Sequence, residues 1–236
     1  MRAARAEEAF REARAFAPVL TVDEGVAAVR LARRALEDAL GPHPSPDVVE
    51  AVAESPRIPL FGERRGVFVT LKRYPDGALR GCIGYPLPVL PLRSALAQAA
   101  VSAATEDFRF RPVRAPDLPR LTIEVSVLTV PAPLRFATPE EAIRSVVVGR
   151  DGLIVEGLGS SGLLLPQVAP EEGWSAEELL DGTCEKAGLP PRAWQDPRVH
   201  VRRFEAEIFH EVAPGGDVVP VPPAGPTAGG RPARRT

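Results

Sequence analysis

The sequence predicts an α+β fold in which mainly antiparallel sheets are flanked by helices. Some segments carry capping residues and apolar positions at helical spacing, and others alternate and are joined by turn residues as β-hairpins are. The two kinds of segment do not alternate regularly along the chain, which disfavours a doubly wound parallel sheet. The 236 residues are enough for one large domain or two small ones with a buried core.

The clearest helix signal covers residues 22–40. Thr21 and Glu24 have the spacing of a capping box, apolar residues follow at helical intervals, and Gly41 and Pro42 end the segment. A charged stretch of Ala, Arg and Glu over residues 1–18 predicts a helical N-terminal extension. Shorter helices are predicted over residues 45–53, over 92–104, from 139 for one or two turns, and over 176–187.

Strand signals begin at residues 66–74, where Val67, Val69 and Leu71 alternate with the side chains of the opposite face. The turn sequence Pro-Asp-Gly at 75–77 and the segment 78–83 complete a predicted hairpin. Further strands are expected at 121–127, 146–148, 153–155, 163–165 and 199–212, with 146–155 as a second hairpin. Pro and Gly dominate residues 213–236, which predicts a disordered tail and leaves 19–212 as the folded domain.

Composition and charge exclude several classes of function. The chain has 29 basic and 31 acidic residues, a net charge of -2, so no broad positive field would attract nucleic acid or an anionic membrane. Two cysteines are no disulfide framework, and we expect a reducing, cytoplasmic location. The sequence contains no run of about 18 apolar residues, so no membrane-spanning helix is expected.

Two apparent ligand motifs do not have the context that their chemistry needs. Residues 157–162 match G-x-G-x-x-G, but a short strand and Pro166 follow where a nucleotide site needs a helix, so we expect a hairpin connection. His200 and His210 lie on one predicted strand, roughly 33 Å apart at about 3.3 Å per residue, too far to share an ion. The sequence therefore predicts no metal site and identifies no cofactor.

The segment LRGCIG at 79–84 is the most specific local feature. Gly81 and Gly84 flank the Cys82 thiol within a strand, which exposes backbone to the close approach of another chain or a ligand. Arg80 could stabilise a thiolate at Cys82. The alternative interpretation is a small buried thiol that packs as alanine would.

A nucleophilic thiol also needs a base within hydrogen-bond reach. Glu124, His200 and His210 are the candidates, and the sequence does not choose among them.

Over residues 22–211 the sequence resembles the AMMECR domain family, whose bacterial members are called protein A of the AmmeMemoRadiSam system. The hallmark of the resemblance is LRGCIG. It is accompanied, in order, by GVFVTL at 66–71, LTIEVSVLT at 121–129, GRDGLI at 149–154, GLLLPQVA at 162–169 and GTCEKAGLP at 182–190. The chain departs from the family at 107–110, Asp-Phe-Arg-Phe, where the family more often has Asp-Pro-Arg-Phe.

The resemblance implies an α+β fold of two subdomains with an intervening cleft, and it places LRGCIG near that cleft. It also implies a genomic association with a Memo-like protein and a radical SAM protein. It implies no settled reaction and no cofactor.

Two functions follow as hypotheses. The first is a cleft enzyme, or enzyme component, that works with these two partners and uses Cys82 as a reactive or ligand-contacting thiol. Arg80 would then be an anion or thiolate partner, and Glu124 or Gln167 would be polar groups that line the site. The second is a non-catalytic adaptor or binding module, in which the glycine-flanked strand and the proline loop at 86–91 dock a partner protein.

Overall fold

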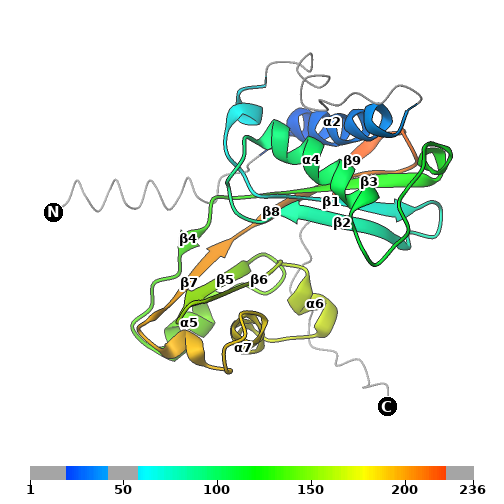
Figure 1. The fold of residues 1–236 in the computed structure, drawn as a ribbon. Coiled ribbons are helices and arrows are strands. Elements are labelled where there is room, and N and C mark those ends of the chain that lie inside the picture. The colour runs from blue at the N-terminus through cyan, green and yellow to red at the C-terminus, as the bar shows by residue number, and fades with distance from the viewer. Residues whose placement is uncertain (1–19, 42–57, 222–236) are drawn as a thin grey trace. The chain divides into compact units, whose positions relative to one another are not determined.

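The computed structural model describes residues 20–41 and 58–221 (Figure 1). Within them the chain forms two compact units, each with its own hydrophobic core. Of the described residues, one unit, which holds a five-stranded sheet, takes 20–41, 58–128 and 207–221, and the other, which holds a four-stranded sheet, takes 129–206. Helices together with antiparallel sheets confirm the predicted α+β class. The helices predicted over 1–18 and 45–53 lie outside the described residues.

The five-stranded sheet has the strand order β2-β1-β3-β8-β9. Strand β1 pairs antiparallel with β2 and with β3, and β8 pairs antiparallel with β9. Helices α2 and α4 pack against each other and on one face of this sheet (Figure 1). The elements are α2 (Val22–Leu40), η1 (Pro59–Gly62), β1 (Val67–Arg73), β2 (Leu79–Tyr85), α4 (Leu92–Thr105), η2 (Ala115–Arg120), β3 (Leu121–Leu128), β8 (Ala206–Glu211) and β9 (Val218–Val221).

Alternation along β1 and β3 decides which side chains enter this core. Val69 of β1 and Val125 of β3 are buried in it with the helices. Thr70 follows Val69 on β1, and Glu124 precedes Val125 on β3. Both side chains therefore face the opposite side of the sheet, where they are half-buried. The predicted hairpin of β1 and β2 is confirmed. The sheet therefore has an apolar face under the helices and a more polar face behind it.

Helix α2 begins at the capping box that the sequence predicts. The Thr21 hydroxyl accepts a hydrogen bond from the Glu24 amide at 3.3 Å, and the Glu24 carboxylate accepts one from the Thr21 amide at 2.8 Å. These two bonds satisfy amides that the first helical turn leaves without partners. The cap fixes where the helix starts and so which of its residues face the sheet.

Helix α4 approaches strand β2 so closely that only glycine fits at position 81. A Cβ atom on Gly81 would lie 2.1 Å from the carbonyl oxygen of Ala103. On the helix side, the contact is made by the small residues predicted there, since Ala99, Ala100 and Ala103 are all buried. The first glycine of LRGCIG thus lets the strand lie against the helix backbone.

A buried ion pair connects α2 to the last part of the sheet. The Arg33 guanidinium donates two hydrogen bonds, each 2.5 Å long, to the Glu211 carboxylate, and a third to the Leu121 carbonyl at 2.7 Å. The same carboxylate accepts the Ile123 amide at 3.1 Å. The side chains of Arg33 and Glu211 are only 9% and 0% exposed. Every charged atom of Glu211 thus has a partner inside the core.

The four-stranded sheet has the strand order β4-β7-β5-β6, again with antiparallel pairs. Its core joins Leu153 and Val155 of β5 to Leu179 and Leu180 of α7, beside the buried Trp194. Ser175 and Glu178 form the predicted capping box of α7. The elements are β4 (Ala132–Pro133), α5 (Pro139–Ser145), β5 (Gly152–Gly157), β6 (Ser160–Leu164), α6 (Val168–Glu172), α7 (Ala176–Lys186), η3 (Ala193–Gln195) and β7 (Val199–Phe204).

Three strand predictions need correction. The segment 146–148 is not a strand, and β5 pairs instead with β6 across the glycine motif, which forms the expected hairpin turn with Gly159 at φ +80°. The single strand predicted over 199–212 is two strands, β7 and β8, which belong to different sheets. Residues 218–221 form β9 against β8, although the tail was predicted to begin at 213. Residues 222–236 lie outside the described chain.

We predict that Glu211→Gln lowers the free energy of unfolding by about 3–5 kcal/mol, because it leaves the Arg33 charge buried without a counter-charge. Urea denaturation measures this change. Asp38→Asn is the control, because it breaks the surface pair Arg34–Asp38, whose removal should cost about 0–1 kcal/mol. Equal losses for the two variants would contradict a structural role for the buried pair.

We predict that Gly81→Ala costs about 1–3 kcal/mol of stability, because the new Cβ must push β2 away from the backbone of α4. The control is Gly62→Ala, because a Cβ there would meet no atom within 4 Å. The same urea titration tests both variants. If the two alanines have the same effect, the close packing of β2 on α4 is not what requires glycine at position 81.

Candidate functional site

Three chemically active side chains lie in one row across three strands of the five-stranded sheet. In the register, Cys82 of edge strand β2 is opposite Thr70 of β1, and Thr70 is opposite Glu124 of β3. Residues opposite one another in adjacent strands share a face, so all three side chains lie on the face away from α2 and α4. The sequence proposed Cys82 and Glu124 separately, and the register brings them into one row.

The thiol of Cys82 is a free, half-buried group that accepts a hydrogen bond. The Thr70 hydroxyl lies 3.2 Å from its sulfur and donates to it. The backbone amide of Cys82 donates to the Asp107 carboxylate at 2.9 Å. This environment differs from the apolar burial that a packing role would give.

Asp107 and Arg109 form a tightly bonded pair beside the thiol. The Arg109 guanidinium donates to both Asp107 carboxylate oxygens, at 2.9 and 2.7 Å. The hydrogen bonds from Arg109 hold the pKa of Asp107 far below its usual value, against the opposing effect of burial, and the Cys82 amide lowers it further. Asp107 is therefore ionised at any physiological pH.

Arg109 interacts electrostatically with Cys82 as well as with Asp107. The pKa of Arg109 is raised chiefly by its hydrogen bonds to Asp107, and the negative charge that Cys82 can carry raises it further. The Arg109 side chain is 47% exposed, whereas that of Asp107 is 3% exposed. The buried carboxylate thus fixes an exposed guanidinium beside the thiol.

A second charged pair lies on the same face. The Lys72 ammonium of β1 donates to the Glu124 carboxylate of β3 at 2.7 Å. Two strand spacings, about 10 Å between backbones, separate Glu124 from Cys82, so the carboxylate does not reach the sulfur directly. His210 is on β8, a further strand away in the sheet order. Neither group is a direct base for the thiol in this arrangement.

The other residues proposed from LRGCIG occupy different surroundings. Gly81 faces α4, and a Cβ on Gly84 would lie 2.3 Å from the Val67 carbonyl oxygen and 2.5 Å from the Phe68 ring. Both glycines are required by packing within the unit, and contact with a ligand stays a prediction. Arg80 stacks on Phe110, with its guanidinium carbon 6.0 Å from the ring centroid, rather than pairing with a carboxylate.

Gln167 and His200 belong to the four-stranded unit. Gln167 precedes α6, and its side-chain oxygen is buried without a hydrogen-bond partner. His200 of β7 is exposed and opposite Glu156 of β5. A shared site of Gln167 with Cys82 stays a prediction.

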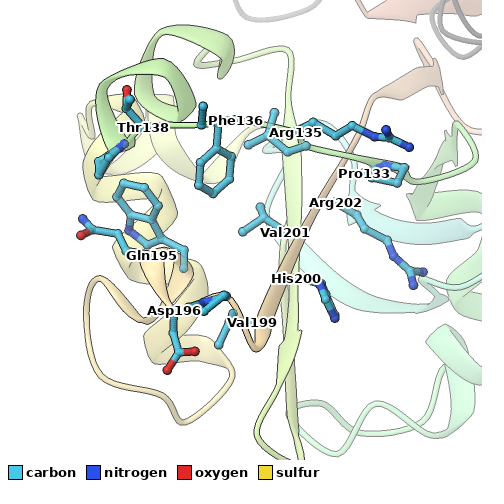
Figure 2. Close-up of a pocket in the computed structure, with 15 residues that line it drawn as sticks. Pro133, Arg135, Phe136, Thr138, Gln195, Asp196, Val199, His200, Val201 and Arg202 are labelled. Atoms are coloured by element: carbon cyan, nitrogen blue, oxygen red, sulfur yellow. The ribbon is translucent and has the colours of Figure 1, made fainter.

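A pocket of about 580 Å³ in the four-stranded unit is lined by residues from 133–139 and from 194–202. Figure 2 shows Arg135, His200 and Arg202 projecting away from the side on which Phe136 lies. The Phe136 ring packs edge-on against Trp194, with centroids 6.0 Å apart. Arg202 is already paired with Glu156 at 3.2 Å. This pocket was not predicted, because its walls come from two segments that are far apart in the chain.

Sequence reasoning also missed four groups around Cys82: Thr70, Lys72, Asp107 and Arg109. A signal for Asp107 and Arg109 was present in the motif at 107–110, which was noted only for its departure from the family pattern. Thr70 and Lys72 could be found from alternation once the hairpin register is known.

Across the described ranges, no three His, Cys, Asp or Glu residues gather as metal ligands. None of the described helices is both long and apolar enough to cross a membrane.

Comparison with known proteins identifies close relatives over most of the chain. A protein of Thermococcus gammatolerans is 54% identical over 193 residues, which are 80% of this chain and 91% of that protein. Protein MJ0810 of Methanocaldococcus jannaschii is 47% identical, over 85% of this chain and 96% of its own. The crystal structure of the uncharacterized protein PH0010 from Pyrococcus horikoshii matches with a TM-score of 0.73 and 47% identity, and covers 87% of this chain and all of that one.

A family model gives the same assignment as these relatives. The AMMECR1 model matches residues 29–209, which cover the described four-stranded unit, most of the five-stranded unit and the Cys82 row. The resemblance seen in the ordered motifs is therefore confirmed, and the chain belongs to the AMMECR1 family.

Proposed function

We propose that this protein is an enzyme, or the component of an enzyme, in which the Cys82 thiol is the reacting group. The observation that carries the proposal is the polar setting of the thiol: its sulfur accepts from Thr70 and lies beside the fixed charge of Arg109. A hydroxyl donor and a cation both stabilise a thiolate, which is the nucleophilic form of cysteine. A thiol that only filled space would need neither group.

The same face supplies groups that would orient a substrate. Lys72 and Glu124 present an ammonium and a carboxylate from neighbouring strands, and both are partly exposed. About two strand spacings separate Glu124 from Cys82, so the proposal gives the carboxylate a role in binding and not that of a base. In this proposal, Lys72 and Glu124 bind a polar part of the substrate while Cys82 reacts.

A Memo-like protein and a radical SAM protein are the proposed partners, and the cytoplasm is the proposed location. The support for the partners is the resemblance to the AMMECR domain family, with LRGCIG as its hallmark. The support for the location is that Cys82 and Cys184 are both free thiols.

We predict that iodoacetamide modifies Cys82 in the native protein and spares Cys184. Cys184 is 0% exposed, and its burial raises the pKa of its thiol. Iodoacetamide therefore does not reach the sulfur, and the reactive thiolate form is disfavoured there. Mass spectrometry of the modified peptides over time measures both rates. Modification of Cys184 as fast as Cys82 would contradict a reactive Cys82.

The same assay tests the charge beside the thiol. Arg109→Gln should slow the modification of Cys82 because it removes the neighbouring cation. Arg111→Gln is the matched control, since Arg111 is an exposed arginine of the same loop. Equal rates in the two variants would show that Arg109 does not activate the thiol.

A second candidate function is the non-catalytic adaptor, and one observation favours it. The proline loop after β2 exposes two large apolar side chains, Leu87 at 41% and Val89 at 50%. Exposed apolar side chains beside a sheet edge are typical of a surface that docks another protein. This function needs the loop and does not need the thiol.

Partner assays separate the two functions. We predict that Cys82→Ala keeps the complex with the Memo-like and radical SAM proteins in size-exclusion chromatography but abolishes its effect on S-adenosylmethionine cleavage by the radical SAM protein. Leu87→Ser with Val89→Ser is the comparison variant, which should weaken the complex and leave iodoacetamide labelling of Cys82 intact. If Cys82→Ala retains full effect on the partner, the adaptor is correct and the enzyme proposal fails.

A further inference from the structure

A pocket of about 330 Å³ lies at the end of the five-stranded sheet where β1 finishes and β2 and β3 begin. It is apart from the Cys82 row and is formed by the hairpin turn and by η2. Three arginines line it, together with one tyrosine and two aspartates: Arg73, Arg80, Arg120, Tyr74, Asp76 and Asp117. Converging guanidinium groups in a hollow are typical of a site for an oxyanion.

A β-bulge directs Arg80 toward this pocket. Leu71 of β1 is opposite Gly81, whereas the next residue, Lys72, is opposite Leu79, so Arg80 has no partner in the register. The extra residue of a bulge leaves the regular alternation of the strand and turns its side chain in a new direction. Its guanidinium carbon lies 6.0 Å from the centroid of the Phe110 ring, over which Arg109 also lies, at 5.5 Å.

The two acidic residues of the pocket are already engaged. Asp76 accepts from the Ala78 amide at 3.1 Å and pairs with Arg73 at 3.0 Å. Asp117 accepts the Arg114 amide at 2.9 Å, as part of the cap of η2. No carboxylate within the described chain forms an ion pair with Arg80 or Arg120. The amide leaves the charge of Asp117 in place, so the lining residues of the pocket carry a net charge of about +1, and neither Arg80 nor Arg120 has a direct carboxylate partner.

Arg80 is also under-satisfied in its hydrogen bonds. The residue is half-buried, and its Nη1 atom is buried with no hydrogen-bond partner among the described residues. A guanidinium that is partly withdrawn from water without a counter-charge is costly unless a ligand supplies that charge. The placement of Arg80 is therefore explained if an anion is bound here.

We propose that this pocket binds a phosphate group through Arg80 and Arg120. A phosphate has enough acceptor oxygens to bond both guanidinium groups at once, and the planar fork of arginine matches its geometry. The Tyr74 hydroxyl adds a neutral donor at the rim, since Tyr74 is 48% exposed. The volume is enough for a phosphate with a small organic group attached, so the ligand class is a small phosphorylated molecule or free phosphate.

Binding of inorganic phosphate and of glycerol 3-phosphate tests the proposal by isothermal titration calorimetry. Sodium acetate and sodium chloride at matched ionic strength are the controls for a general salt effect. We expect saturable binding of both phosphates at millimolar concentration and none of acetate. Tighter binding of glycerol 3-phosphate would identify a phosphorylated molecule as the ligand, and equal binding would identify free phosphate.

Three variants locate the site. Arg80→Gln and Arg120→Gln should each weaken phosphate binding about tenfold or more, as loss of a charge-assisted hydrogen bond does. Arg34→Gln, at a 66% exposed side chain of α2, should leave binding unchanged although it removes the same charge. Equal affinities in all three variants, or no saturable binding by the native protein, would overturn the proposal.

The thiol assay remains independent of this result. Arg120→Gln should not alter the labelling rate of Cys82, because Arg120 is in η2, outside the strands β1, β2 and β3 that carry the Cys82 row. Failure of phosphate binding would therefore leave the proposed thiol chemistry untouched, and failure of labelling would leave the anion site untouched.

Discussion

The five-stranded unit depends on the buried ion pair between Arg33 and Glu211. The Glu211 carboxylate ties β8 at once to α2 and to the Ile123 amide of β3. Between β3 and β8 the chain builds the whole four-stranded unit, so the sheet is completed by a strand that is distant in sequence. Local propensity cannot bring β8 back to that place. The pair of Arg33 and Glu211 determines where β8 joins the sheet, because a shift in register would leave these charges buried without partners.

Features determined by neighbours in sequence were predictable. The capping boxes at Thr21 and Ser175 and the hairpin of β1 and β2 are set by residues a few positions apart, and each was found where predicted. The alternating segment 199–212 shows what such local patterns do not predict. Its pattern continues through Glu205, because both parts have one buried face, and alternation does not encode which sheet each part joins.

The residues of the candidate site were likewise predictable only in part. Cys82 and its glycines were conspicuous in sequence because a thiol between two glycines is unusual within a strand. Asp107 and Arg109 were missed because an irregular loop has no periodicity that would predict its position. The loop follows α4, which packs on β2, and the Asp107 carboxylate joins it to that strand by accepting the Cys82 amide. Sequence thus located the thiol, and the fold supplied its electrostatic setting.

The bond from the Cys82 amide to Asp107 has a consequence for how other chains can approach. Strand β2 is at the edge of its sheet, where free amides usually invite another strand to add on. The Cys82 amide already donates to the Asp107 carboxylate, and an added strand would have to bury that charge at a cost in free energy. Strand addition at this point is blocked by the same residue that fixes Arg109. A macromolecule that reaches Cys82 must therefore recognise side chains on the face of the sheet, and the edge is protected against aggregation.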